Sequence, residues 1–183
     1  MSAFDRYKGL FAEGGKFDIP ANFAVGAAVK ITPKATVLFD EERILYGQVK
    51  AIANSDANQA PLGSSNGPGF GWHDINVAKA GVSSKVNPAL TVRAGYNHSG
   101  LPFSDTQTFF NLLAPAVTQD HLHVGTSVAL KSGKEINFAY VHAFDNTVQG
   151  VNSIAASYGG GNANLSMYQN SFQVSFGWNR NKK

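Results

Sequence analysis

The strongest constraint on the fold is an alternation with a period of two residues, which recurs in five segments of the chain. Apolar side chains occupy every second position, as in β-strands whose two faces meet different surroundings. The other positions hold mostly Gly, Ala, Ser and Asn, with few charges such as Lys30 and Arg93. The five segments are residues 23–31, 90–98, 122–130, 136–144 and 172–178. A soluble sandwich would place many charges on the second face, so the pattern favours a sheet between lipid and an enclosed lumen.

Two further segments are rich in strand-forming residues but change phase partway. In residues 35–49 the alternation breaks at Glu41–Arg43, which a β-bulge would explain. In residues 73–85, Ile75 and Val77 lie on one parity and Val82 on the other. With these two, the sequence predicts about seven strands.

Short and long connections alternate between the predicted strands. The short ones are turns at Thr32–Lys34, Val86–Pro88 and Ser132–Lys134. The long ones are residues 50–72, 99–120 and 145–169. In an up-and-down sheet alternate connections lie at the same end, so all turns are expected at one end and all long loops at the other. This layout is typical of antiparallel transmembrane β-barrels.

Composition excludes several other classes. Only 15% of residues are charged, against roughly 25% in ordinary soluble domains, yet no run approaches the ~18 apolar residues of a membrane helix. The absence of Cys excludes disulfides and thiolate metal sites. Lys and Arg are scattered and the net charge is only +3, so we expect no nucleic-acid partner.

No enzyme motif is evident. The Gly-rich Gly67–Gly71 lacks the Lys and Ser/Thr of a phosphate-binding loop, and there is no nucleophile elbow or zinc-protease helix. His121 and His123 would share a strand face, but no third ligand is in view. We therefore expect no enzymatic activity, no cofactor and no metal site.

Ordered motifs along most of the chain resemble one family. They are Tyr7–Glu13 (YKGLFAE), Phe17–Pro20 (FDIP), Gly67–Trp72 (GPGFGW), Arg93–Tyr96 (RAGY), Asn111–Pro115 (NLLAP), Asp120–His121 and Gly159–Gly161. From Phe4 to Trp178 the chain resembles the FadL/TodX family of long-chain fatty acid and aromatic hydrocarbon transporters in the outer membrane of Gram-negative bacteria.

The resemblance implies a barrel of about fourteen strands with an N-terminal hatch, of which this chain matches the C-terminal half; bacterial single-chain barrels close with an even number of strands. We therefore expect a single partial-barrel domain over residues 1–183 and a fragment that lacks the signal peptide, hatch and first strands. Residues 1–20 would form an extracellular loop with a short helical segment, 21–178 the strands and their loops, and 179–183 a tail. The expected partners are outer-membrane lipid and the missing N-terminal half.

The resemblance also implies passive uptake of fatty acids or hydrocarbons, and two groups of residues are candidates for the ligand site. Apolar side chains near the N-terminus, on helical spacing, and in the loop 99–120 indicate either a capture groove or packing on the barrel rim and mouth. These apolar candidates are Phe4, Tyr7, Leu10, Phe11, Phe103, Phe109, Phe110, Leu112 and Leu113.

Two cations, Lys79 and Arg93, are expected to point into the lumen. Either could hold the carboxylate of a ligand, and Arg could do so with two hydrogen bonds. The alternative is that they pair with Asp40 or Glu42 across the lumen. A different function also stays open at this point, namely a soluble lipid-binding or adhesin-like β-domain that acts through its long loops.

Overall fold

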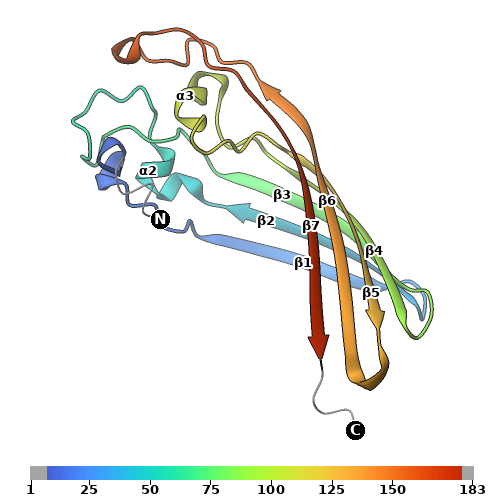
Figure 1. Ribbon diagram of the computed structural model, residues 1–183. Coiled ribbons are helices and arrows are strands. Elements are labelled where there is room, and N and C mark those ends of the chain that lie inside the picture. The colour runs from blue at the N-terminus through green and yellow to red at the C-terminus, as the bar shows by residue number, and fades with distance from the viewer. Residues whose placement is uncertain (1–7, 179–183) are drawn as a thin grey trace.

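The computed structural model describes residues 8–178, apart from the side chains of Lys8 and Ser132, and its strands form one antiparallel sheet (Figure 1). Its seven strands pair in sequence order, as an up-and-down sheet requires. The strands are β1 (Asn22–Lys30), β2 (Ala35–Ile44), β3 (Ile75–Lys85), β4 (Leu90–Ser99), β5 (Asp120–Ala129), β6 (Lys134–Val148) and β7 (Leu165–Trp178). The predicted fold class is thereby confirmed, and every predicted strand is present.

The register divides the strand residues between two faces. Residues directly opposite each other in neighbouring strands point to the same side. Tyr96 is paired with Leu122, Val124 with Tyr140, and Tyr140 with Phe172, so the apolar sets of the alternating segments share one side, the apolar face. The intervening small and polar residues form the other side, the polar face.

No bulge interrupts β2, so the prediction of one near Glu41–Arg43 is wrong. Nine consecutive residues of β2 pair with β1 and ten with β3 without a shift. The alternation fails there because charged residues stand on both faces: Glu41 and Arg43 on the apolar face, and Asp40 and Glu42 on the polar face.

The phase change in β3 has a different cause. Ile75 and Val77 lie on the polar face but are buried, because the long loops cover that end of the sheet. Further along β3 the loops no longer cover the polar face. There the large apolar residue is Val82, which lies on the exposed apolar face. The change of phase therefore marks the edge of the loop layer.

A true bulge lies in β6, where the register shifts between Ala143 and Asn146. Beyond it, Asn146 to Val148 continue to pair with β7, which begins at Leu165. The connection between the two strands thus spans 149–164, which is shorter than the predicted loop 145–169. The extra residue of a bulge bends the strand, and beyond this bend β6 and β7 continue as a pair next to the loops.

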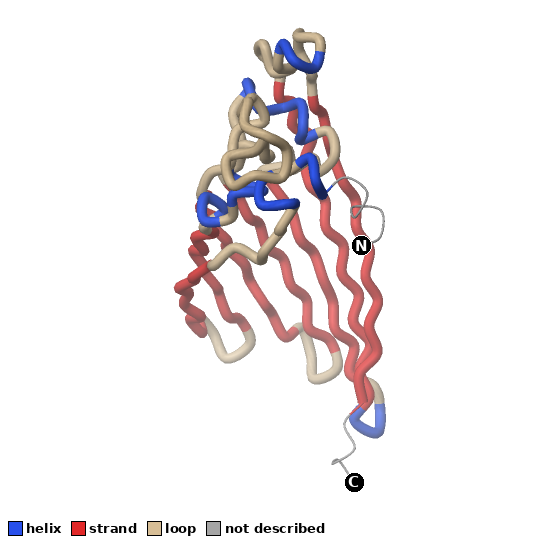
Figure 2. Tube along the Cα trace, turned by 90° about the vertical axis from the view of Figure 1, so that its left-hand side faces the viewer, coloured by secondary structure: helices blue, strands red, loops and turns tan. Residues whose placement is uncertain are grey.

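The long connections gather into a cap at one end of the sheet, and the turns lie at the other (Figures 1 and 2). The cap comprises residues 8–21, 45–74, 100–119 and 149–164. Its short helices are η1 (Lys8–Leu10), η2 (Ala12–Gly14), η3 (Tyr46–Gln48), α2 (Lys50–Ala53), η4 (Asp105–Gln107), α3 (Thr108–Asn111) and η6 (Ala156–Tyr158), while η5 (Lys131–Gly133) lies in a turn. Within residues 8–178 no helix has the length and apolar character to cross a membrane.

Candidate functional site

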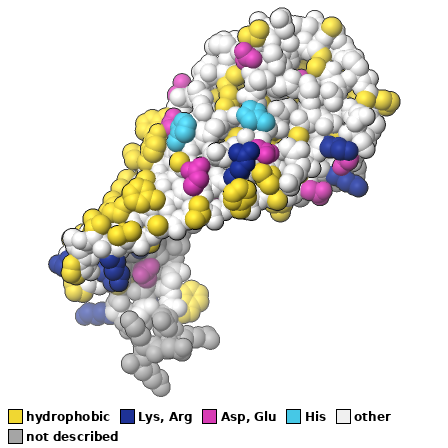
Figure 3. Space-filling view, turned by 180° about the vertical axis from the view of Figure 1, so that it is seen from behind, with side chains coloured by type: hydrophobic (Ala, Val, Ile, Leu, Met, Phe, Trp, Pro, Cys, Tyr) yellow, Lys and Arg dark blue, Asp and Glu magenta, His cyan; other side chains and the backbone are white. Residues whose placement is uncertain are grey.

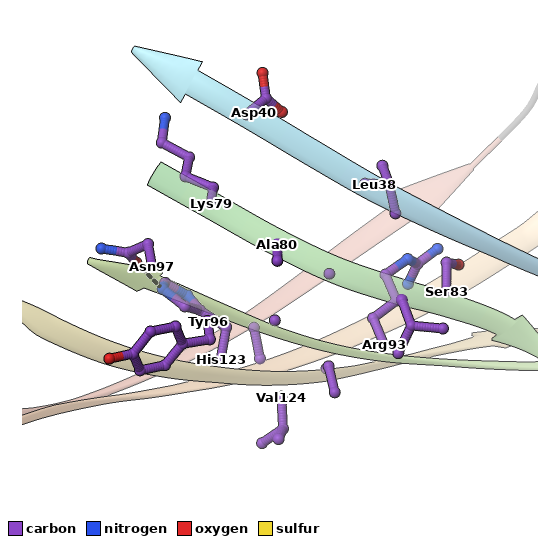
Figure 4. Close-up of a pocket in the computed structure, with 16 residues that line it drawn as sticks. Leu38, Asp40, Lys79, Ala80, Ser83, Arg93, Tyr96, Asn97, His123 and Val124 are labelled. Atoms are coloured by element: carbon purple, nitrogen blue, oxygen red, sulfur yellow. Dashed lines mark hydrogen bonds between the residues drawn. The ribbon is translucent and has the colours of Figure 1, made fainter. Parts of the chain in front are cut away.

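A cavity of about 720 Å³ lies on the polar side of the sheet. Strands β2 to β6 line it, and Gly81, Gly95 and Gly125 leave its floor without side chains. In Figure 4, Asp40 and Lys79 point to this side, whereas Val124 points to the opposite one. The alternation of small and large residues in the sequence is therefore what opens the cavity.

Lys79 is neutralised within the protein. Its Nζ lies 2.7 Å from Glu42 Oε2, and Asp40 is its register partner in β2. By the register, Lys79 and Arg93 both belong to the polar face. Lys79 could bind the carboxylate of a ligand or pair with an acidic residue of the protein, and in the structure it pairs with Glu42.

Arg93 has a different environment. Its Nη1 donates a 2.6 Å hydrogen bond to Ser127 Oγ, and the Ser127 hydroxyl donates to the side-chain oxygen Oδ1 of Asn137. No carboxylate in residues 8–178 lies within ion-pair distance of Arg93, and its remaining N–H groups make no other hydrogen bond there. The guanidinium is thus anchored on one side by β5 and β6 and keeps donors for an acceptor in the cavity.

Three side chains at the cap end of the cavity form a directional network. Asn97 Nδ2 donates to His121 Nδ1 at 3.1 Å, and Asn97 Oδ1 accepts from His123 Nε2 at 2.6 Å. The amide orientation therefore fixes which imidazole nitrogen carries the proton. Within the described chain, no cluster of three or more metal-binding side chains is found. Asn97 and His123 of this network give the cavity polar groups along its wall.

The apolar candidates in the loops divide into buried and exposed groups. Phe11 and Phe110 lie in a core with Phe70, and Leu10 and Phe109 pack against it. A second core holds Phe103 with Val117, Val148 and Leu165. Leu112 and Leu113 are exposed. Phe4 and Tyr7 lie outside the described residues.

Aromatic residues that were not selected from the sequence complete the core of the cap. Phe70 stacks on Phe11 with ring centroids 4.9 Å apart, and Tyr158 meets Phe109 at 5.5 Å. Trp72 packs edge-on against Tyr46 at 4.9 Å. The GPGFGW motif already contained Phe70 and Trp72, but only the folded loops bring them against residues 8–21.

Buried polar side chains tie the three long loops together. Trp72 Nε1 donates to Asn111 Oδ1 at 2.5 Å, and Asn111 Nδ2 donates to the Phe70 carbonyl at 2.8 Å. Thr108 Oγ1 donates to the Ala163 carbonyl at 2.5 Å. Long loops of this kind have little secondary structure of their own, so these bonds hold the cap in one arrangement.

One carboxyl group in the cap lacks a full set of partners. Asp56 is 3% exposed, and its Oδ2 is buried without a hydrogen-bond partner in the described part of the molecule. Burial raises the pKa of Asp56 to about 6, although the backbone N–H groups of Phe110 and Ala57 act in the opposite direction. The group sits where the loop 45–74 meets η4 and α3: the Asp56 N–H donates to Gln107 Oε1 of η4 at 2.9 Å, and the N–H of Phe110 in α3 donates to the carboxyl group.

The apolar face is exposed along the sheet (Figure 3). Phe138, Val124 and Phe172 are 47%, 42% and 81% exposed, respectively. In a β-sandwich these three side chains would be buried against a second layer. The described residues form a single layer, so the structure is not a sandwich.

A single up-and-down sheet with an exposed apolar face, a polar cavity behind it and all long loops at one end has the architecture of a transmembrane β-barrel wall. Among solved structures, the chain is similar to the toluene transporter TodX of P. putida, with a TM-score of 0.66 and 22% identity over 92% of this chain and 36% of that chain. It is also similar to the Ralstonia pickettii toluene transporter TbuX, with a TM-score of 0.50 and 19% identity over 71% of this chain and 30% of that chain.

These similarities confirm the expected resemblance at the level of the fold. The chain spans about a third of the length of the structures it matches, which fits a match to part of the barrel. Neither protein-family models nor curated proteins gave a match to this chain.

Proposed function

We propose that this chain is part of an outer-membrane channel through which hydrophobic compounds, such as long-chain fatty acids or aromatic hydrocarbons, enter by passive diffusion. The observation that carries the proposal is the opposite character of the two faces of one sheet. The solved structures with a similar fold are described as toluene transporters and a monoaromatic hydrocarbon channel. The proposal involves no catalytic step and no cofactor.

In this proposal the apolar face contacts acyl chains and the polar face lines the lumen. Transmembrane strands need about 9–11 residues, and the strands here have 9 to 15. The exposed Leu112 and Leu113 on the cap would meet a ligand before it reaches the lumen. Each methylene that leaves water contributes about 0.8 kcal/mol, so an acyl chain gains from even partial burial there.

We further propose that Arg93 recognises a carboxylate head group in the lumen. Lys79 already pairs with Glu42, whereas Arg93 lacks a carboxylate partner among the described residues and faces the cavity. Its donors would meet a fatty acid head group while Leu38 and the glycine floor accommodate the apolar tail. A neutral aromatic hydrocarbon has no charged group for the guanidinium to bind and gains only a weaker cation–π contact of about 0.5–1 kcal/mol.

Intrinsic fluorescence offers a direct test of binding, because the chain has two tryptophans and Trp178→Phe leaves Trp72 as a reporter in the cap. We expect saturable changes on titration with palmitate and with toluene. In this background Arg93→Gln should weaken palmitate binding about tenfold or more, since a charged hydrogen bond contributes about 1.5–3 kcal/mol. Toluene binding should weaken at most a few-fold, since it loses only a cation–π contact of about 0.5–1 kcal/mol. Equal effects on both ligands would refute the role of Arg93, and absence of binding by either would count against the channel.

Membrane insertion separates the proposal from the soluble alternative. The channel requires the refolded chain to enter the detergent phase on partition and to float with lipid vesicles. A chain that stays in the aqueous phase and unfolds at low urea would support a soluble lipid-binding or adhesin-like β-domain.

A further inference from the structure

The three short turns carry an excess of positive charge. Five lysines lie in or beside them, against the single acidic residue Glu135. These turns therefore hold a net charge of +4, while the rest of the 183 residues sum to −1 with His neutral. The lysines are Lys30, Lys34, Lys85, Lys131 and Lys134, here termed the lysine row.

Backbone hydrogen bonds arrange the turns side by side along one edge. The Lys85 N–H donates to the Lys34 carbonyl at 2.8 Å, which joins the first turn to the second. The Ala129 N–H donates to the Ala89 carbonyl at 2.7 Å, which joins the second turn to the third. Figure 3 shows Lys and Arg side chains gathered at this tip of the sheet.

The charges of the lysine row are not neutralised within the described part of the protein. All five side chains are exposed, and none takes part in an ion pair among residues 8–178. Like charges along one edge repel each other, and an anionic surface would replace this repulsion by attraction. The chemistry of this edge therefore fits an anionic partner.

The immediate neighbours of the lysine row favour a lipid surface over an acidic protein. Ile31, Val86, Leu130 and Trp178 are large apolar residues exposed at the same edge. Lysines beside exposed apolar residues are the arrangement that places stems among acyl chains and ammonium groups at the head groups. A soluble acidic partner would leave those apolar side chains in water.

We propose that the lysine row binds the phosphate groups of anionic phospholipids in the leaflet at the turn end of the sheet. This inference rests on the proposed function as a membrane channel. Each lysine near an anionic surface strengthens binding by about fivefold at moderate ionic strength. The lysine row thus holds the turn end of the sheet at the phosphate groups of one leaflet and so sets the depth and orientation of the sheet in the membrane. The cap lies at the opposite membrane surface.

The test is flotation of the refolded full chain with vesicles of phosphatidylcholine alone and with 30% phosphatidylglycerol, each at low and high salt. The first variant carries Lys34→Gln, Lys85→Gln and Lys131→Gln. A matched control carries Lys8→Gln, Lys16→Gln and Lys50→Gln, which removes three lysines from the cap end.

We expect phosphatidylglycerol to strengthen binding in a salt-sensitive manner, the turn variant to lose about a hundredfold of that gain, and the control to keep it. Equal losses in both variants, or no gain from phosphatidylglycerol, would overturn the inference. Binding to phosphatidylcholine alone reports on the apolar face, so its loss in the unaltered chain would instead contradict the channel proposal. Salt-sensitive self-association without a phosphatidylglycerol effect would indicate a protein partner and would also overturn the lipid assignment.

Discussion

Replacement of Asp56 by Asn is the perturbation that most directly probes the cap. The Asp56 carboxyl is buried between the loop 45–74 and α3, and one of its oxygens has no hydrogen-bond partner in the described chain. Asn has the same shape and no charge, so it resembles the protonated carboxyl. The substitution therefore removes the cost of burying a negative charge and changes little else.

The pKa of Asp56, which burial raises from 3.8 to about 6, determines how the free energy of unfolding of the cap changes with pH. A raised carboxyl pKa means that the folded cap binds a proton more tightly than the unfolded one. The resulting stability is fully present below pH 3.8 and is lost as the pH rises through about 6. Two pKa units correspond to about 3 kcal/mol, so we expect the cap to lose up to that amount between pH 4 and pH 7.

The assay is urea unfolding of the cap followed by Trp72 fluorescence in the Trp178→Phe background, at several pH values between 4 and 7.5. Trp72 reports on the cap because it hydrogen-bonds to Asn111 and packs against Phe70. Asp56→Asn should be more stable than the parent at pH 7 and should show no pH dependence in this range. Asp105→Asn, at an exposed carboxylate on η4, serves as the matched control and should keep the pH dependence of the parent.

If the parent cap became more stable as the pH rose from 4 to 7, the sign of the argument would be refuted. If Asp56→Asn and Asp105→Asn shifted the pH profile equally, the effect would belong to surface charge in general. Either result would mean that burial of Asp56 does not control the stability of the cap.

Three further predictions concern the sheet and the cap core. Val124→Arg should impair membrane insertion by roughly 2–4 kcal/mol, measured by refolding into vesicles, whereas Gln173→Arg on the polar face should have a much smaller effect; equal effects would contradict the assignment of the faces. Gly150→Ala should destabilise the cap by about 1–3 kcal/mol, because an added Cβ would lie 2.2 Å from a carbonyl oxygen, while Gly9→Ala meets nothing within 4 Å and should be neutral in urea unfolding. Phe11→Ala should cost about 3–5 kcal/mol of cap stability in the same assay, and a cost near zero would show that the aromatic core does not hold the cap together.

The sheet was predictable from the sequence because its two faces meet different surroundings along most of each strand. Wherever one environment persists, as for Val25 and Val29 in β1 or Phe172 and Val174 in β7, the alternation of residues reveals the strand. The prediction of a bulge in β2 was wrong because charged residues stand on both faces of that strand. The bulge in β6 depends on the pairing with β7 and on the neighbouring loop, which no local pattern contains.

The candidate site was predictable in part, for a similar reason. Parity alone placed Lys79 and Arg93 on the polar face, but the partners of these cations depend on the register. The hydrogen bonds from Arg93 to Ser127 and from Ser127 to Asn137 cross three strands. In the loops, a core and a capture groove both require apolar residues, so sequence could not separate the buried Phe110 from the exposed Leu112.

Strand direction restricts what can close the proposed barrel. Strands β1 and β7 are the two edges of the sheet, and because seven strands alternate in direction, both run from the cap end to the turn end. Antiparallel closure therefore requires a segment whose first and last strands both run the other way, which is an odd number of strands.

Two copies of this sheet in the same membrane orientation could meet only through parallel seams between β1 and β7. An N-terminal half with an odd number of strands would instead satisfy both edges with antiparallel ladders, and in lipid each unpaired backbone group costs several kcal/mol. We therefore expect co-refolding with a segment of seven such strands to produce a closed species that resists unfolding in detergent. A segment of six strands should fail to do so, because one of its seams would have to be parallel. Equal yields of closed species from the two segments would show that edge pairing does not determine the closure.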